Sequence, residues 1–442
     1  MNAIPRQRVS VIDMTSPTGR SDYDIVLVGA TGFVGRLTAA HLRDHAPEGV
    51  RIAIAGRSRA KLDAVAAELG GAAGSWPRLL VDVADPAACA DLAASTRVVV
   101  TTVGPYALHG RELVKACAVA GTHYADLTGE VLFARDSAEA FHDVARRSGA
   151  KIVHSCGFDS IPSDLGVLET ARLAAEEGAG ELTDTVLFVR SLKGGLSGGT
   201  IASMRQQTIT SRESVEDRRA INDPYGLSPD RAAEPTRADR DGATSTEAPA
   251  KRGRLARIGS RLPVRRTEDG HWTGPFIMAS YNTRVVRRSN ALQGWRYGRA
   301  FRYHEVTDFG STAKSPFAAA GMTAGLLGVV GAMSFSPTRG LLDRALPGPG
   351  EGPDEKSRTN GRFRMEVVAT TTSGAKYATT VAAKADPGYN GTAIMLGQSA
   401  LCLAEDDLQG EGGVLTPAVA LDGALVERLR AHDFTIETHR LD

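Results

Sequence analysis

Apolar and polar segments alternate regularly along the first 150 residues. Short runs of Ile, Val, Leu and Ala are separated by segments whose apolar residues recur at helical spacing. This alternation predicts buried parallel strands joined by crossover helices. The predicted strands are 24–29, 51–55, 78–81, 97–102, 124–127 and 151–154, and the predicted helices are 33–44, 58–70, 86–94, 110–120 and 132–148. We therefore expect an α/β fold with a Rossmann-type, doubly wound parallel sheet.

The pattern changes from about residue 183 onward. Strands are predicted at 185–190, 276–287 and 296–306, and a hairpin at 362–371 and 375–384 around Ser373-Gly374. A glycine loop at 194–199 precedes a predicted helix at 201–209, and helices return at 392–404 and 417–431. The sequence therefore predicts a second, α+β domain with a mostly antiparallel sheet.

These patterns divide the chain into four parts. Residues 1–21 are predicted to be a disordered leader, and 22–155 the Rossmann domain. Residues 156–385 are predicted to form the α+β substrate domain, which carries a polar insertion at 211–270 and an apolar segment at 317–335. Residues 386–442 are predicted to be a C-terminal helical segment that packs back on the Rossmann domain.

A glycine-rich turn follows the first predicted strand and opens the first predicted helix. It reads Gly29, Ala30, Thr31, Gly32, Phe33, Val34 and Gly35. Glycines at such a junction allow a tight turn, the approach of a pyrophosphate to backbone N–H groups, and close packing of helix on strand. We expect a dinucleotide to bind here, although a structural strand–turn–helix junction can carry the same triplet.

The end of the second strand favours NADP(H) over NAD(H). NAD sites usually place an acidic residue there, which binds the ribose hydroxyls. This chain has Arg57 and Ser58 instead, and a guanidinium suits a 2′-phosphate that a carboxylate would repel. Asp82 is a further candidate near the adenine, with a helix-capping role as the alternative. Gly104 and Pro105 follow the fourth strand, where the chain passes the nicotinamide, or simply terminate that strand.

Composition and charge narrow the function classes. The 442 residues include 52 Lys and Arg against 51 Asp and Glu, a formal net charge of +1, which argues against a nucleic-acid-binding protein. The four cysteines form no CxxC pair, and no metal site is expected. The N-terminal residues lack the apolar core of a secretory signal. We expect a cytoplasmic protein with reduced thiols.

Candidate catalytic groups are polar side chains that the topology places near the nicotinamide. They are Tyr106, His109, Tyr124, Asp126, Glu130, His154 and Asp159. Tyr106 and Asp126 are the preferred pair, because a phenol after the fourth strand can bond a carbonyl oxygen; turn hydrogen bonds and helix caps are the alternative roles. None of the nine tyrosines has Lys four positions later, so a Tyr-x-x-x-Lys acid is disfavoured.

Two further segments suggest contact with a surface. Residues 317–335 contain no charged side chain, which predicts a buried helix or one that touches a bilayer in preference to a true span. Residues 251–266 are rich in Lys and Arg with apolar residues interleaved, and would meet anionic lipid, an acidic carrier protein or simply solvent. Peripheral contact at the inner face of the plasma membrane is therefore one expectation, and a homodimer is left open.

Besides the glycine turn, four longer segments are distinctive: 102–106, 116–130, 156–164 and 412–418. Together they resemble the saccharopine dehydrogenase-like oxidoreductase superfamily, and within it most closely the trans-acting enoyl reductases. The resemblance covers most of 22–442. The resemblance implies that NADPH reduces a carbon–carbon double bond of a lipid or polyketide acyl substrate, carrier- or synthase-bound, in lipid or glycolipid biosynthesis. Two alternatives stay open: a non-catalytic NADP-binding scaffold or sensor, and an imine or keto reductase of the saccharopine dehydrogenase type.

Overall fold

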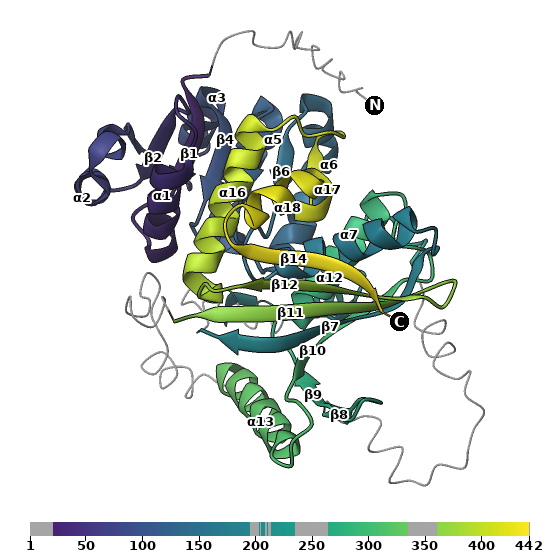
Figure 1. Ribbon diagram of the computed structural model, residues 1–442. Helices are drawn as coiled ribbons and strands as arrows, with labels where there is room; N and C mark the ends of the chain where they lie inside the picture. Colours follow the sequence, from purple (N-terminus) through teal and green to yellow (C-terminus); the bar gives the residue numbers. More distant parts are fainter. Residues whose placement is uncertain are drawn as a thin grey trace, which may run out of the picture.

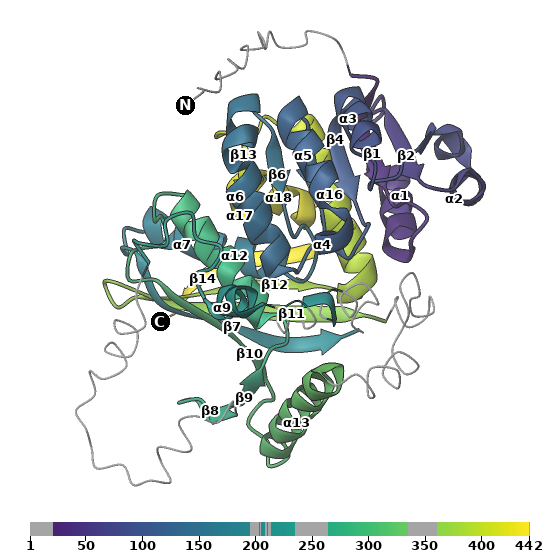
Figure 2. The same cartoon turned by 180° about the vertical axis from the view of Figure 1, so that it is seen from behind.

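The computed structural model describes residues 21–194, 203, 205–207, 210, 214–234, 264–334 and 360–441. Two seven-stranded sheets form separate layers, which Figures 1 and 2 show one above the other. Helices α7 (Ile161–Glu176) and α12 (Ala279–Leu292) lie beside the second sheet and connect the two layers. Residues of both sheets and of these two helices share one large apolar core.

The first sheet is entirely parallel. Its strand order is β13-β6-β5-β4-β1-β2-β3. The strands are β1 (Tyr23–Val28), β2 (Ile52–Gly56), β3 (Arg78–Leu80), β4 (Thr96–Thr101), β5 (His123–Ala125), β6 (Lys151–Val153) and β13 (Gly413–Leu415). The predicted doubly wound sheet is confirmed. The seventh strand, β13, comes from the far end of the chain and pairs with β6.

Helices cover both faces of this sheet, because side chains of successive strand residues point to opposite faces. In β1, Ile25 and Leu27 belong to one core and Val26 and Val28 to the other. The first face carries α1 (Phe33–His45), α2 (Arg59–Leu69), α16 (Thr392–Glu405) and α18 (Asp422–Arg430). The second face carries α3 (Pro86–Ser95), α5 (Arg111–Ala120) and α6 (Val131–Ser148). Short turns complete the layer: the 3-10 helix Gly71–Ser75, α4 (Tyr106–His109) and α17 (Pro417–Ala420).

The second sheet is mostly antiparallel, as predicted. Its strand order is β14-β12-β11-β7-β10-β9-β8, and only the β7–β10 pair is parallel. The strands are β7 (Leu182–Lys193), β8 (Arg265–Arg266), β9 (Trp272–Pro275), β10 (Arg302–Asp308), β11 (Arg362–Thr371), β12 (Lys376–Ala383) and β14 (Phe434–Leu441). A π-helical turn, Pro387–Gly391, leads from this sheet into α16.

One predicted strand is wrong. Residues 276–287 fall largely in α12, and the next predicted strand, 296–306, begins only at Arg302. The run that includes Val285 and Val286 has the β-branched residues typical of a strand. In the structure these residues belong to a helix buried on most sides, where Asn282 donates to Ser163 and to Glu305. Tertiary burial therefore overrides local propensity here.

Other predicted segments lie partly or wholly outside the described residues. These are the leader except for Ser21, the glycine loop except for Gly194, most of the helix at 201–209, and residues 211–213 and 235–263 of the polar insertion. The basic segment predicted at 251–266 therefore lies outside the described residues except for 264–266. The described part of the insertion contains α9 (Val215–Asn222). The following turn packs on α12, where Arg287 donates to the Pro224 carbonyl at 2.8 Å and Arg288 to the Leu227 carbonyl at 2.7 Å.

The uncharged segment forms α13 (Ser315–Ser334), which stands apart from the first sheet beside β8 and β9 (Figure 1). One narrow stripe of this helix, Ser315, Ala319 and Thr323, is buried. Phe317 and Leu327 point outward and are 78% and 66% exposed. The expectation of a buried helix is therefore wrong. Within the part of the chain that the structure describes, no helix is long and apolar enough to cross a membrane.

Candidate functional site

The glycine turn between β1 and α1 has the geometry of a pyrophosphate cradle. Gly29 has a φ of +86°, which favours glycine. A Cβ on Gly35 would lie 2.2 Å from the Gly29 carbonyl oxygen, so α1 can approach the turn this closely only with glycine there. Among the described residues, no side chain caps the N-terminus of α1, and the positive end of the helix dipole favours an anion at this point.

The three residues predicted to bind the adenosine half of the cofactor, Ser58, Asp82 and Arg57, differ in whether their side chains already have a partner. The Ser58 hydroxyl caps α2 by accepting from the Lys61 N–H at 3.4 Å. Asp82 accepts from the Ala84 N–H at 3.0 Å and so forms a turn. Arg57 is exposed and has no hydrogen bond or ion pair to any other described residue. Of the three, Arg57 is therefore the side chain most available for a 2′-phosphate.

We expect Arg57→Ala to weaken NADPH binding about 10- to 100-fold and to leave NADH binding nearly unchanged, since a charge-assisted hydrogen bond contributes about 1.5–3 kcal/mol. Fluorescence titration with NADPH and with NADH measures the two dissociation constants in the wild type and in the variant. Arg59→Ala is the matched control, because the Arg59 guanidinium already forms an ion pair with Asp63 at 3.2 Å. Equal loss of both cofactors in Arg57→Ala would contradict the assignment.

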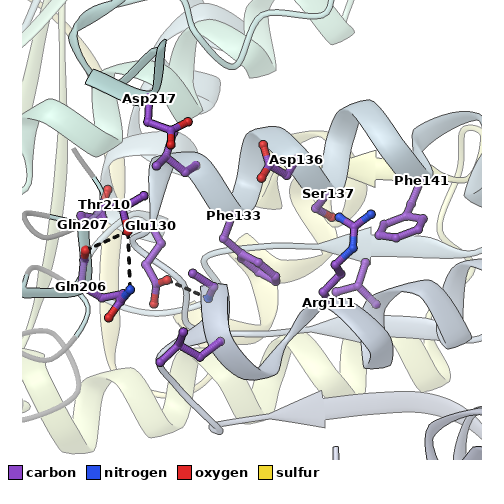
Figure 3. A pocket seen from close by; sticks show the side chains of 14 residues that line it. Arg111, Glu130, Phe133, Asp136, Ser137, Phe141, Gln206, Gln207, Thr210 and Asp217 are labelled. Atoms are coloured by element: carbon purple, nitrogen blue, oxygen red, sulfur yellow. Dashed lines mark hydrogen bonds between the residues drawn. The ribbon is translucent and has the colours of Figure 1, made fainter. Parts of the chain in front are cut away.

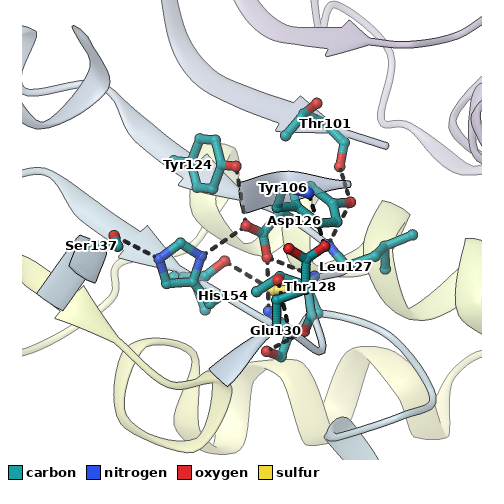
Figure 4. A network of polar contacts seen from close by, with 12 residues as sticks. Thr101, Tyr106, Tyr124, Asp126, Leu127, Thr128, Glu130, Ser137 and His154 are labelled. Carbon is teal, nitrogen blue, oxygen red and sulfur yellow. Dashed lines mark hydrogen bonds and ion pairs between the residues drawn. The ribbon is translucent and has the colours of Figure 1, made fainter. Parts of the chain in front are cut away.

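Tyr106 begins α4 directly after Gly104 and Pro105, and its side chain is buried. The hydroxyl donates to the Thr101 carbonyl at 3.2 Å and accepts from the Leu127 N–H at 3.1 Å (Figure 4). Burial raises the pKa of this phenol well above its usual range. The geometry gives the hydroxyl a structural task, joining the end of β4 to the segment after β5. The expected bond from Tyr106 to a substrate carbonyl has no support in these contacts.

Asp126 lies fully buried after β5 and collects hydrogen bonds from several directions. Its Oδ1 accepts from the N–H groups of Thr128 and Ser155, each at 3.0 Å. Its Oδ2 accepts from the Tyr124 hydroxyl at 3.1 Å and lies 2.7 Å from Nδ1 of His154 (Figure 4). Asp126 is therefore the centre of a network and does not itself face open space.

Glu130 is a second fully buried carboxylate, at the N-terminus of α6. It accepts from the N–H groups of Tyr106 and Ala107, both at 2.8 Å, and from the Ser203 hydroxyl at 2.6 Å. Three donors on one carboxylate fix α4 against α6 and tie both to the segment around residue 203. Glu130 thus connects the end of β4 with the cavity described next.

A cavity of about 250 Å³ lies between α4, α5 and α6 (Figure 3). Apolar side chains such as Leu108, Val114 and Phe133 line one part of it, and Gln206, Gln207 and Thr210 line another. The guanidinium of Arg111 stacks over Phe141, 5.3 Å from the ring centre, and reaches the cavity. A mostly apolar cavity with a few convergent polar groups is the usual form of a small-molecule site.

Two cavity residues were not anticipated from the sequence. Arg111 of α5 and Ser137 of α6 both line the cavity (Figure 3). In the predicted helix, Phe133, Ser137 and Phe141 recur every four residues and share a face. The one polar residue within this otherwise apolar stripe, Ser137, is the sequence feature that could have marked it as a site residue. Of the other candidates, Tyr124 and His154 bond to Asp126, and Glu130 bonds to the backbone of Tyr106 in the same network. His109 ends α4, and Asp159 lies between β6 and α7.

Comparison with known proteins shows the family of this chain. Residues 25–153 match the family model of the saccharopine dehydrogenase NADP binding domain. A trans-acting enoyl reductase of Mycobacterium tuberculosis is 45% identical over 96% of this chain and 100% of its own length. That of Mycobacterium ulcerans is 44% identical over 96% and 99%. A second M. tuberculosis protein, provisionally given the same name, is 48% identical over 95% and 98%.

The fold also has a solved counterpart. Apo saccharopine dehydrogenase (L-Glu forming) from Saccharomyces cerevisiae superposes with a TM-score of 0.51, over 95% of this chain and 100% of its own. The two sequences are only 13% identical. This likeness shows a common architecture of two sheets and carries no information on substrate.

Proposed function

Because this chain belongs to the trans-acting enoyl reductase family, with the NADP-binding domain of saccharopine dehydrogenases, we propose that it reduces the carbon–carbon double bond of an α,β-unsaturated acyl thioester. The cofactor is NADP(H), which supplies the hydride when bound. The observation that carries the proposal is the identity of 44–48% with enoyl reductases over nearly the whole chain, including both sheets.

The residues around the glycine turn fit the cofactor. Gly29, Gly32 and Gly35 leave room for a pyrophosphate at the start of α1. The exposed guanidinium of Arg57, at the end of β2, is the proposed partner of the 2′-phosphate. Gly104 and Pro105 lie after β4, at the carboxyl edge of the sheet, where the nicotinamide of such folds is held. The chain's own task is then to position the acyl group and to keep the reacting atoms dry.

The cavity beside α4 is the proposed acyl-binding site. Its apolar wall suits an alkyl chain, and the Arg111 guanidinium can polarise the thioester carbonyl, on which negative charge grows as the hydride arrives. Residues Ala107 and Leu108 belong both to this wall and to the segment directly after Gly104 and Pro105. The family name further supports a substrate presented by a separate synthase.

Oxidation of NADPH with a panel of enoyl thioesters tests this function. We expect turnover with unsaturated acyl thioesters and none with their saturated counterparts. Binding of NADPH without oxidation across the panel would favour the scaffold or sensor alternative. Oxidation with keto or imine substrates alone would favour the saccharopine dehydrogenase type of chemistry.

The exposed face of α13 supports a lipid surface as a further partner in this proposal. Lys314 directly precedes α13. Arg265 and Arg266 lie on β8, which pairs with β9, the strand next to the helix. All three side chains are exposed. The turn between β8 and β9 also carries the exposed Glu268 and Asp269. The apolar side chains of α13, which a membrane accepts below its headgroups, are therefore what favours a lipid surface. A homodimer through α13 is the competing arrangement.

We expect the protein to sediment with vesicles of phosphatidylglycerol and phosphatidylcholine, and Phe317→Ser with Leu327→Ser to reduce the bound fraction about tenfold or more. Burying one such side chain contributes about 1.5–3 kcal/mol. Leu80→Ser, at an exposed leucine of β3, is the control. Unchanged vesicle binding in the double variant, or a dimer in ultracentrifugation that the double variant dissociates, would contradict the lipid assignment.

A further inference from the structure

A line of hydrogen bonds leads from the buried Asp126 carboxylate to the cavity. Asp126 Oδ2 lies 2.7 Å from Nδ1 of His154, and Nε2 of the same ring lies 2.8 Å from the Ser137 hydroxyl (Figure 4). Asp126 and His154 are buried, and Ser137 lines the cavity. We infer that Ser137, His154 and Asp126 form a proton relay whose outer end, the Ser137 hydroxyl, protonates the bound substrate.

Asp126 holds the imidazole in the orientation that such a relay needs. The Thr128 and Ser155 N–H groups anchor its Oδ1, which leaves Oδ2 to accept from Nδ1–H of His154. The remaining nitrogen, Nε2, then exchanges a proton with Ser137. When the ring is neutral, Ser137 donates a hydrogen bond to Nε2. When the ring is protonated, Nε2–H donates to the serine oxygen, and the Ser137 hydroxyl can then donate its hydrogen bond into the cavity.

Aromatic side chains and two charged groups surround the His154 ring. Tyr124 and Phe133 contact the ring edge-to-face, at 5.8 and 5.2 Å between ring centres. Across a small cavity of about 20 Å³ lie Tyr281 and Arg288 of α12. Tyr281 is bonded to the Ser155 hydroxyl at 2.6 Å, and Arg288 donates to the carbonyls of Leu227 and Val414. The charged groups around the ring are thus Asp126 on one side and Arg288 on the other.

The same three residue types also form nucleophilic triads, but two features favour a relay. Ser137 lies inside α6, beyond the first turn, where backbone N–H groups bond within the helix instead of forming an oxyanion hole. His154 does not belong to the described lining of the cavity next to α4, so a leaving group there would not reach its Nε2. Ser137 is therefore the only member of the three that a ligand in this cavity meets.

The relay rests on the proposed function and completes its proton balance. Once the β-carbon has received a hydride, the electron pair of the double bond resides on the α-carbon and the thioester oxygen. The O–H bond of Ser137 breaks as a C–H bond forms at the α-carbon, and the Nε2 proton of His154 moves to the serine oxygen. His154 is left neutral, and a solvent proton entering the emptied cavity recharges it through Ser137. The substrate gains one hydride and one proton.

We expect Ser137→Ala to lower kcat on the order of 100-fold, which is the usual range for losing a general acid, with NADPH affinity and melting temperature near wild type. Ser137→Thr, which retains a hydroxyl, should recover most of the activity. The solvent deuterium isotope effect on kcat should change in Ser137→Ala. Glu139→Gln, on an exposed face of the same helix, is the control. Wild-type turnover in Ser137→Ala, or an acylated Ser137 found by mass spectrometry, would overturn the relay.

Nitrogen-15 NMR of the histidine ring tests the relay without turnover. In Ser137→Ala the Nε2 resonance of His154 should shift, whereas the Nδ1 resonance, held by Asp126, should stay in place. An unchanged Nε2 resonance would overturn the relay. If the wild-type protein reduces no enoyl thioester, the proposed function is wrong. The NMR spectrum still tests the Ser137–His154 relay independently, because it requires no turnover.

Discussion

Gly35→Ala is expected to eliminate NADPH binding and to lower the free energy of unfolding by about 3 kcal/mol, the upper range for overpacking a tight site. The added Cβ would lie 2.2 Å from the Gly29 carbonyl oxygen and 2.9 Å from Cα of Ala30. Both are backbone atoms of the turn itself, so α1 must move away from it. Chemical denaturation and fluorescence titration measure the two effects.

Gly32→Ala separates the turn's stability from its role in binding. A Cβ on Gly32 would meet only the Gly29 carbonyl oxygen, at 3.4 Å, a contact that small shifts can relieve. We therefore expect this variant to fold with nearly wild-type stability but to bind NADPH more weakly, because the methyl group occupies the approach of the pyrophosphate. Normal stability and normal binding in Gly35→Ala would contradict the cradle.

Asp126→Ala should cost about 3–5 kcal/mol of stability, the range for removing one partner from a buried charged network. The change leaves the N–H groups of Thr128 and Ser155 and the Tyr124 hydroxyl without their shared acceptor. It also removes the anchor of the His154 ring. Urea denaturation followed by circular dichroism measures the loss.

Two further variants bracket this prediction. Asp126→Asn keeps one carbonyl oxygen for the two N–H groups and should cost less than the alanine. Asp136→Asn, at an exposed carboxylate of α6, should change stability by no more than about 0.5 kcal/mol. An Asp126→Ala protein within 1 kcal/mol of wild type would mean that the network is not a structural centre.

The strands of the first sheet could be predicted because each is marked by the residues within it and directly after it. Each strand from β1 to β6 is a short apolar run followed by a helix with one apolar face, and the predicted bounds agree with the structure within a few residues. β13 has no such context: its three residues become a strand only by pairing with β6, more than 250 residues away. Similarly, α12 is helical because its neighbours bury it, against the strand propensity of Val285 and Val286.

The candidate site divides along the same line. The glycine turn and Arg57 are predicted from the sequence alone, because their positions after the first and second strands follow the pattern of a dinucleotide site, and their contact with the cofactor stays a prediction. The role of Tyr106 could not, because the partners of its hydroxyl, Thr101 and Leu127, are set by how β4 and β5 pair. Ser137 is a candidate only because its hydroxyl contacts His154, and that contact depends on how α6 packs against the end of β6.

The exposure of α13 has the same cause. Its uncharged sequence is compatible with a core position, yet β9, the short strand between β10 and the edge strand β8, covers only the stripe of Ser315, Ala319 and Thr323. Whether an apolar helix is buried depends on the area its neighbours offer, which no local pattern reports. The exposed remainder is the basis for a lipid surface as partner.

We propose that the chain directs a hydride to the β-carbon of an enoyl thioester. NADPH deuterated at the transferring position of the nicotinamide C4 tests this directly when the label is followed by mass spectrometry and NMR of the product. We expect a saturated thioester with one deuterium at the β-carbon and a solvent-derived hydrogen at the α-carbon. Deuterium on a former carbonyl or imine carbon, or NADPH that binds and is never oxidised, would contradict it.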